Sequence, residues 1–179
     1  MAYEIIHSLV TYRGRAFSVR RDQIRLPDGE AANLDIVEHS GAVTCVPLDD
    51  QERLWFVRQY RHAAGKMLLE LPAGTLERGE PPEDCARREL REEIGMRAEH
   101  LEKIGEFYLA PGYSTEYMHV YLATSLRPDA LPGDKDEFLS VEIIPVQNVL
   151  EMVETGEIQD AKTLAAILLA RAHLNISRL

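Results

Sequence analysis

Three glutamates near the middle of the chain have a spacing that could bring their carboxylates together. Glu89, Glu92 and Glu93 fall in a segment of helical periodicity, where about 100° per residue places all three on one face. Like charges at this spacing destabilise a helix, so the cluster would favour a bound cation. Hard divalent cations such as Mg²⁺ bind oxygen ligands of this kind. The other interpretation is a solvated acidic face, balanced by the arginines that lie between the glutamates.

The residues on either side of the glutamates favour the first interpretation. Five residues separate Gly74 from Glu80, and seven more separate Glu80 from Arg88-Glu89-Leu90. This spacing resembles the Nudix box, and a match at all its positions is expected by chance on the order of once in a million chains of this length. The nine defining positions are filled by Gly74, Glu80, Arg88, Glu89, Leu90, Glu92, Glu93, Gly95 and Met96.

The resemblance to Nudix hydrolases implies a divalent metal site on this helix. Glu89 and Glu93 would coordinate Mg²⁺ together with the main-chain carbonyl of Ala73, and Glu92 would complete or orient the set. Mn²⁺ could substitute for Mg²⁺. Arg88 would fix one of the carboxylates rather than contact the substrate. The structural positions of the box are Gly74, Glu80, Arg88 and Gly95.

The resemblance also implies a catalytic base in an acidic loop further along the chain. Residues 133–137 resemble the loop that supplies this base in ADP-ribose pyrophosphatases. Glu137 fits best because it directly precedes an expected strand, and Asp134 and Asp136 are weaker candidates. Glu92 is the next catalytic candidate. A polar turn without a chemical role stays open as the alternative.

Two arginines, a glutamate and a proline outside the box indicate where a substrate would bind. Arg58 and Arg61 lie at the end of an expected strand, and the planar guanidinium group suits phosphate oxygens. Arg61 resembles the diphosphate-binding arginine of the family, and Glu70 would line the same site. Pro111, sixteen residues beyond Gly95, matches a downstream proline of ADP-ribose pyrophosphatases. These flanking residues favour that subfamily.

The resemblance implies Mg²⁺-dependent hydrolysis of the diphosphate of a nucleoside diphosphate linked to another moiety. ADP-ribose, giving AMP and ribose 5-phosphate, is the leading substrate. GDP-mannose, FAD and other nucleotide sugars stay open, because Leu34-Asp35 departs from the Arg-Glu that family members often carry. A non-catalytic nucleotide sensor would be expected to lose box glutamates. A prenyl diphosphate isomerase would need a reactive Cys/Glu pair, which Cys45 and Cys85 do not indicate.

The elements that must position these residues are mostly strands. A helix is expected over residues 81–94, because prolines stand at its start and Gly95 at its end. Many strands and few helices, without strict βαβ alternation, predict an α+β fold. The other expected elements are strands over residues 4–11, 16–26, 33–39, 42–48, 53–60, 67–71, 100–109, 117–124 and 138–144, and helices over 146–154 and 160–174.

The resemblance implies a Nudix fold, an αβα sandwich around a mixed sheet, preceded by a small N-terminal antiparallel β subdomain. Ser40-Gly41 marks the expected boundary between the subdomain, residues 1–40, and the Nudix domain, residues 41–179. Chains below about 40 residues rarely fold alone, so the subdomain needs a larger surface. The family resemblance implies a homodimer, in which the subdomain helps to build the partner's substrate site.

Composition limits the other partners. The 179 residues carry a net charge of −10, which repels phosphate backbones and argues against binding to nucleic acid or to an anionic membrane. No stretch approaches the ~20 apolar residues of a membrane span, and the N-terminus lacks the apolar core of a signal peptide. Two cysteines cannot form a disulfide framework. The sequence therefore predicts a cytoplasmic protein with a small-molecule substrate.

Overall fold

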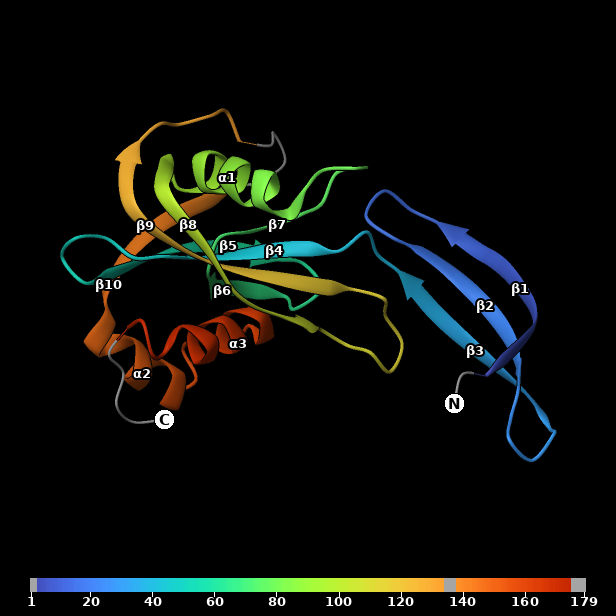
Figure 1. Cartoon of the computed structure of the whole chain (residues 1–179). Coiled ribbons are helices and arrows are strands. Elements are labelled where there is room, and N and C mark those ends of the chain that lie inside the picture. The colour runs from blue at the N-terminus through green and yellow to red at the C-terminus, as the bar shows by residue number, and fades with distance from the viewer. Residues whose placement is uncertain (1–2, 134–137, 175–179) are drawn as a thin grey trace. The chain divides into compact units, whose positions relative to one another are not determined.

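The computed structural model describes residues 3–133 and 138–174 (Figure 1). The chain divides into two compact units. The first comprises Met1–Gly41 and Phe107–Tyr117, and the second comprises Ala42–Glu106 and Met118–Leu179. The first unit therefore contains a segment that is distant from it in sequence.

The first unit is built on a three-stranded antiparallel sheet. β1 (Glu4–Arg13), β2 (Ser18–Arg25) and β3 (Ala31–Glu38) lie side by side in this order. The expected N-terminal β structure is therefore confirmed. Large apolar side chains of β1 stay exposed, with Ile5 and Leu9 both at 57%. Within the described part of the chain, this strand keeps an apolar surface open to solvent.

A four-stranded mixed sheet forms the centre of the second unit. Its strands follow the order β7 (Ala73–Thr75), β4 (Ala42–Pro47), β9 (Tyr117–Pro128) and β8 (Met96–Tyr108). β4 runs parallel to β9 and antiparallel to β7. Every residue of β4 is buried, as expected for a strand whose apolar run lacks polar alternation.

A second sheet of three antiparallel strands completes the β structure. β5 (Arg53–Arg61) lies between β10 (Leu139–Pro145) and β6 (Lys66–Glu70). This pairing places Arg58 opposite Leu69, near the end of β6 that leads directly into the box, and Arg61 opposite Lys66 at the start of β6. The predicted strands over residues 53–60, 67–71 and 138–144 are confirmed to within one or two residues.

The helices lie on the two sides of the sheets. Both α1 (Pro82–Glu93) and α3 (Ala161–Ala170) contact the central strand β4, and α2 (Val146–Glu154) contacts β10. Figure 1 shows α1 on one side of β4 and α3 on the other. The arrangement confirms the predicted α+β fold with an αβα sandwich.

The structure differs from the expected elements in several places, including β9, which runs to Pro128, four residues beyond the expected end. β7 is a short strand that was not among the expected elements, because its pairing with β4 is set by tertiary contact. β8 begins at Met96, four residues before the expected start, and α3 ends at Ala170 before the expected end at residue 174. Among the described residues, no helix is long and apolar enough to cross a bilayer.

Candidate active site

The box helix α1 is fixed by signals at both of its ends. Pro82 occupies the first turn, where its missing N–H costs nothing, and Glu83 and Asp84 complement the helix dipole. At the other end, Gly95 adopts a φ of 67°, a conformation that favours glycine. The chain can therefore turn directly from α1 into β8.

One face of α1 is packed into the core of the second unit. Ala86 and Leu90 are fully buried, and Ile94 is 5% exposed. They pack in one cluster with residues of β4 and β9, among them Val43 and Tyr121. This packing fixes the rotation of the helix and so determines which face carries the glutamates.

Glu89 and Glu93 lie at the edge of this packed face and are 8% and 5% exposed. The Ala73 backbone N–H of β7 donates a hydrogen bond to Glu93 Oε2 at 2.9 Å. Ala73 is itself aligned with Thr44 of β4 in the antiparallel register. A nearly buried carboxylate of the helix is thus held against the first strand of the box.

Gly74 is required by close approach rather than by its φ angle. A Cβ atom built at this position would lie 1.7 Å from Glu89 Oε1 and 1.9 Å from the Glu89 Cδ carbon. Any side chain at residue 74 would displace the Glu89 carboxylate, because contacts this short do not occur. The glycine of the box therefore makes room for one of its glutamates.

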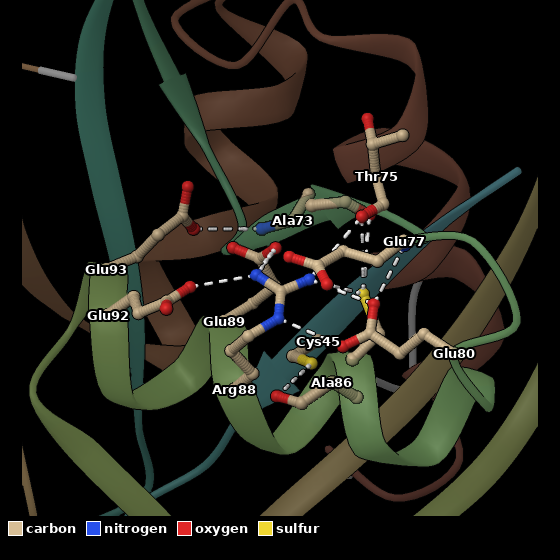
Figure 2. A network of polar contacts seen from close by, with 12 residues as sticks. Cys45, Ala73, Thr75, Glu77, Glu80, Ala86, Arg88, Glu89, Glu92 and Glu93 are labelled. Carbon is tan, nitrogen blue, oxygen red and sulfur yellow. Dashed lines mark hydrogen bonds and ion pairs between the residues drawn. The ribbon is translucent and has the colours of Figure 1, made fainter. Parts of the chain in front are cut away.

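Arg88 lies at the centre of a network of carboxylates, which we call the Arg88 cluster (Figure 2). Its Nε donates to Glu80 Oε1 at 2.9 Å. Its Nη1 donates to Glu89 Oε1 at 2.6 Å and to Glu92 Oε2 at 2.8 Å. Glu80 also accepts from the Glu77 backbone N–H at 2.9 Å. The members of the cluster are Glu80, Arg88, Glu89 and Glu92.

Hydrogen bonds within the Arg88 cluster favour the ionised forms of Glu80 and Arg88. The hydrogen bond from Arg88 lowers the pKa of Glu80, against the opposing effect of burial. The same hydrogen bond raises the pKa of Arg88 well above its usual value; burial opposes this shift, and the charge of Glu89 adds to it. One guanidinium therefore bonds three carboxylates, and the four side chains together keep an excess of negative charge.

Two thiols lie beneath the cluster in their neutral form. Burial, followed by the charge of Glu89, raises the pKa of the Cys85 thiol. Burial, followed by the charge of Glu93, raises the pKa of Cys45 well above its usual value. Both side chains are fully buried. Protonated thiols are poor ligands for a hard cation, so both cysteines act as packing residues.

The donor set of the box fits a hard divalent cation. The carboxylates of Glu89, Glu92 and Glu93 and the carbonyl of Ala73 offer only oxygen atoms. Within residues 3–133 and 138–174, no three His, Cys, Asp or Glu side chains already stand together as a metal-binding group. Arg88 occupies the oxygens of Glu89 and Glu92 instead.

The predicted substrate arginines have different partners. Arg61, at the end of β5, makes two hydrogen bonds to Glu70 of β6, at 2.8 and 2.7 Å. Arg58 is bonded to Glu142 of β10 and to Glu157. Successive side chains of a strand point to opposite faces, so the odd spacing of Arg58 and Arg61 separates them. The structure brings Arg61 and Glu70 together and pairs Arg58 elsewhere.

Two further predicted site residues, Pro111 and Glu137, are not brought to these contacts by the described part of the structure. Pro111 is exposed in the turn after β8 and belongs to the first unit. Glu137 lies outside the described residues, as do Asp134 and Asp136. Gly133, the last described residue before them, lies near the backbone of Glu92, since a Cβ built on it would be 3.4 Å from the Glu92 carbonyl oxygen.

The sequence analysis missed residues of α3 that reach the same region. Lys162 donates hydrogen bonds to Glu70 and to Asp160, the latter at 2.9 Å. Thr163 accepts from the Leu71 backbone N–H at 2.9 Å. An Asp that caps a helix, followed three residues later by Thr, is a visible helix-start signal. The contact of Lys162 with Glu70, 92 residues away in sequence, has no local signal.

The geometry of the box agrees with comparisons of the whole sequence. A family model described as "NUDIX domain" matches residues 38–167. The chain belongs to the Nudix family. It is 39% identical over 158 residues to "ADP-ribose pyrophosphatase" of Bacillus subtilis, covering 87% of this chain and 85% of that protein. It is 40% identical over 173 residues to "ADP-ribose pyrophosphatase" of Mycobacterium tuberculosis, covering 95% and 84%.

Other Nudix relatives are more distant. The chain is 33% identical over 148 residues to "GDP-mannose pyrophosphatase" of Citrobacter koseri, covering 73% of this chain and 77% of that protein. Its fold is similar to that of the solved structure described as "Crystal structure of ADP compounds hydrolase", with a TM-score of 0.87 and 26% identity. That similarity covers 98% of this chain and 95% of the solved one. The predicted Nudix family and fold are confirmed.

Proposed function

We propose that this Nudix pyrophosphatase hydrolyses ADP-ribose to AMP and ribose 5-phosphate with Mg²⁺ as its cofactor. The observation that carries the proposal is the 40% identity with an ADP-ribose pyrophosphatase over 95% of the chain. The intact box, with Gly74 making room for Glu89, supports turnover rather than binding alone. All of its glutamates are present.

We assign the metal-binding role to Glu89, Glu93 and the Ala73 carbonyl, with Glu92 completing the set. Bound Mg²⁺ would neutralise the diphosphate and activate a water molecule, and Mn²⁺ could substitute for it. Arg88 fixes the orientation of Glu89 and Glu92 through its hydrogen bonds. The Ala73 N–H does the same for Glu93. The chain therefore restrains the orientation of each of these carboxylates.

We assign diphosphate binding to Arg61 rather than to Arg58. The Arg61 side chain is 42% exposed, and its two bonds to Glu70 fix the plane of the guanidinium group. A planar fork held in this way suits phosphate oxygens. Arg58 braces β5 against β10 through Glu142.

We assign the proton acceptor of the reaction to Glu137, with Glu92 as the second candidate. The assignment depends on the resemblance of residues 133–137 to the acidic loop of ADP-ribose pyrophosphatases. The nearness of Gly133 to the Glu92 carbonyl supports it. Pro111 keeps its proposed role in substrate binding on the same resemblance.

We further propose a cytoplasmic homodimer in which residues 1–40 help to build the partner's substrate site. The exposed apolar side chains of β1 support an interface on this sheet. Light scattering at micromolar concentration should give twice the 20.3 kDa chain mass. A fully active monomer would contradict the proposal.

The substrate proposal is tested by a turnover panel with Mg²⁺. The panel comprises ADP-ribose, GDP-mannose, FAD, NADH, diadenosine polyphosphates and deoxynucleoside triphosphates. ADP-ribose should have the highest kcat/KM, with AMP and ribose 5-phosphate as products. A tenfold higher kcat/KM for GDP-mannose or FAD would replace the substrate and keep the reaction class.

GDP-mannose is the second candidate substrate because of the relative in Citrobacter koseri. Leu34-Asp35 stands where family members often carry Arg-Glu, which also keeps GDP-mannose open as a substrate. Asp35 forms an ion pair with Arg21 of the neighbouring strand at 2.7 Å, and both side chains are more than half exposed. Its carboxylate is thus already paired within the first unit.

A further inference from the structure

Glu70, at the end of β6, is a buried carboxylate shared by two cations. Its side chain is 1% exposed. Arg61 donates to both of its oxygens, and Lys162 of α3 donates to Oε2. The Lys162 side chain is 12% exposed, whereas that of Arg61 is 42% exposed. Of the two cations, Arg61 is the one that can meet a ligand.

The two cations keep Glu70 ionised. Burial acts to raise the pKa of this carboxyl, but the hydrogen bonds from Arg61 and Lys162 outweigh it and lower the pKa. A buried anion with a single cation forms a neutral pair. Asp160 pairs with Lys162 at 2.9 Å, so Arg61, Lys162, Glu70 and Asp160 together carry two positive and two negative charges. Without Lys162 they would carry one net negative charge.

Lys162 is fixed in place by the first turn of α3. Asp160 caps the helix, accepting from the Thr163 backbone N–H at 3.0 Å and from its hydroxyl at 2.6 Å. The same Thr163 hydroxyl oxygen accepts from the Leu71 N–H, next to Glu70. The Asp160 charge lies at the positive end of the helix, which offsets part of it. The start of α3 is thereby tied to the end of β6.

Arg61 is also within electrostatic range of the box. Its hydrogen bond to Glu70 is the main cause of its raised pKa, and the charge of Glu93 contributes to the same shift. Nε and Nη2 make the two bonds to Glu70. A guanidinium carries five N–H donors in a planar fork, so further donors stay available for a phosphate oxygen.

We propose that Lys162 is a positioning residue for Arg61. By pairing with Glu70 and Asp160, Lys162 offsets their negative charge, so that the Arg61 guanidinium can attract the substrate diphosphate. The inference rests on the proposed function, because it takes a diphosphate as the ligand of Arg61. Lys162 itself contacts Glu70 and Asp160 and acts through them.

The test is the substitution Lys162→Met, with steady-state kinetics on ADP-ribose at saturating Mg²⁺. Loss of one nearby charge should raise KM about tenfold, a typical effect for a partly buried pair. The value of kcat should stay within about twofold, and Lys162→Arg should restore KM. A general loss of structure would lower kcat and would not be reversed by arginine.

Lys66→Met is the matched control. Lys66 is aligned with Arg61 in the β5–β6 register and is exposed. Its ammonium group bonds Gln159 rather than Glu70. KM should therefore stay at the wild-type value. An equal rise of KM in Lys66→Met and Lys162→Met would overturn the proposal, because the loss of any nearby positive charge would then explain both effects without a contact to Glu70.

A double-mutant cycle with Arg61→Gln tests the route through Arg61. In the Arg61→Gln background, Lys162→Met should change KM by less than about threefold, because coupled residues are not additive. A full tenfold effect in that background would overturn the proposal. If Lys162→Met does not fold, Lys162→Gln replaces it: raised KM supports the charge argument, and wild-type KM overturns it.

A binding measurement distinguishes failure of this inference from failure of the proposed function. Wild-type protein that fails to hydrolyse ADP-ribose contradicts the function. Calorimetric titration of ADP-ribose into wild type and Lys162→Met in EDTA then decides the inference. About tenfold weaker binding to the variant supports it, and equal binding or none to either protein overturns it.

Discussion

Two charged clusters in the second unit differ in their balance of charge. In the Arg88 cluster, one guanidinium is shared by three carboxylates. In the second, which we call the Glu70 cluster, one buried carboxylate is shared by Arg61 and Lys162, and Asp160 completes it. The first has an excess of negative charge near the box, and the second places a partly exposed cation beside it. A divalent metal and a diphosphate are the ligands with the matching charges.

Glu137→Gln tests the proposed base and changes no member of either cluster. It should lower kcat by about 10²–10⁴, the usual contribution of a positioned proton acceptor. The Mg²⁺ requirement should stay unchanged, and higher pH should restore part of the rate, since hydroxide can replace activated water. Rates at two pH values and several Mg²⁺ concentrations measure this. Wild-type kcat in the variant would exclude Glu137 and leave Glu92 as the base.

Glu93→Gln removes the charge of one of the proposed metal-binding carboxylates of the box. The neutral amide has nearly the same shape as the carboxylate, but it is a weaker ligand for a hard cation. We expect a rate loss of about 10²–10³-fold at limiting Mg²⁺, partly recovered at high Mg²⁺. Glu83→Gln, an exposed residue of the first turn paired with Arg87, is the control and should titrate like wild type. A loss that no Mg²⁺ concentration reduces would argue against metal binding by Glu93.

Arg88→Lys should remove the cation that spans the Arg88 cluster. A lysine cannot reproduce the fork that bonds Glu80, Glu89 and Glu92 together. The free energy of unfolding should fall by about 1–3 kcal/mol. Added Mg²⁺ should stabilise the variant more than wild type, because its carboxylates are less well balanced. Urea unfolding with and without Mg²⁺ measures both quantities, and an identical Mg²⁺ effect in the two proteins would contradict this account.

Acid should weaken the Glu70 cluster. The pKa of Glu70 in the folded protein lies below its usual value of 4.5, so its stabilising effect is present above that value and is lost as pH falls through the folded pKa. The free energy of unfolding of wild type should therefore decrease below about pH 4.5. Glu70→Gln should show a shallower decrease over the same range. Parallel curves for the two proteins would show that Glu70 does not contribute.

The box could be predicted from sequence because its information is local. The helix over residues 81–94, its apolar stripe and the positions of Glu89 and Glu93 all follow from spacing within a single element. The stop at Gly95 is a local signal as well. For these residues, neighbouring positions in the sequence are neighbouring positions in space.

The Glu70 cluster could not be predicted in the same way. Glu70 and Lys162 are far apart in the chain, and tertiary packing brings their elements together, with α3 packed on β4 and Thr163 bonded to Leu71. The strand β7 depends likewise on its partner β4. The odd spacing of Arg58 and Arg61, by contrast, was visible and indicates that the two side chains leave the strand on opposite faces.

The position of β4 has a consequence for motion at the active site. Its six buried residues pair with β9 on one edge, and three of them, Ala42, Val43 and Thr44, pair with β7 on the other. Ala73 and Gly74 are therefore paired with a fully buried strand. Amide hydrogens in such a strand exchange with solvent mainly through global unfolding. The amide hydrogens of β4 should therefore be among the slowest in the unit to exchange, whereas those of β7, a partly exposed strand at the sheet edge, should exchange faster. The Ala73 carbonyl, proposed as a metal ligand, therefore lies beside a strand that opens only when the unit unfolds.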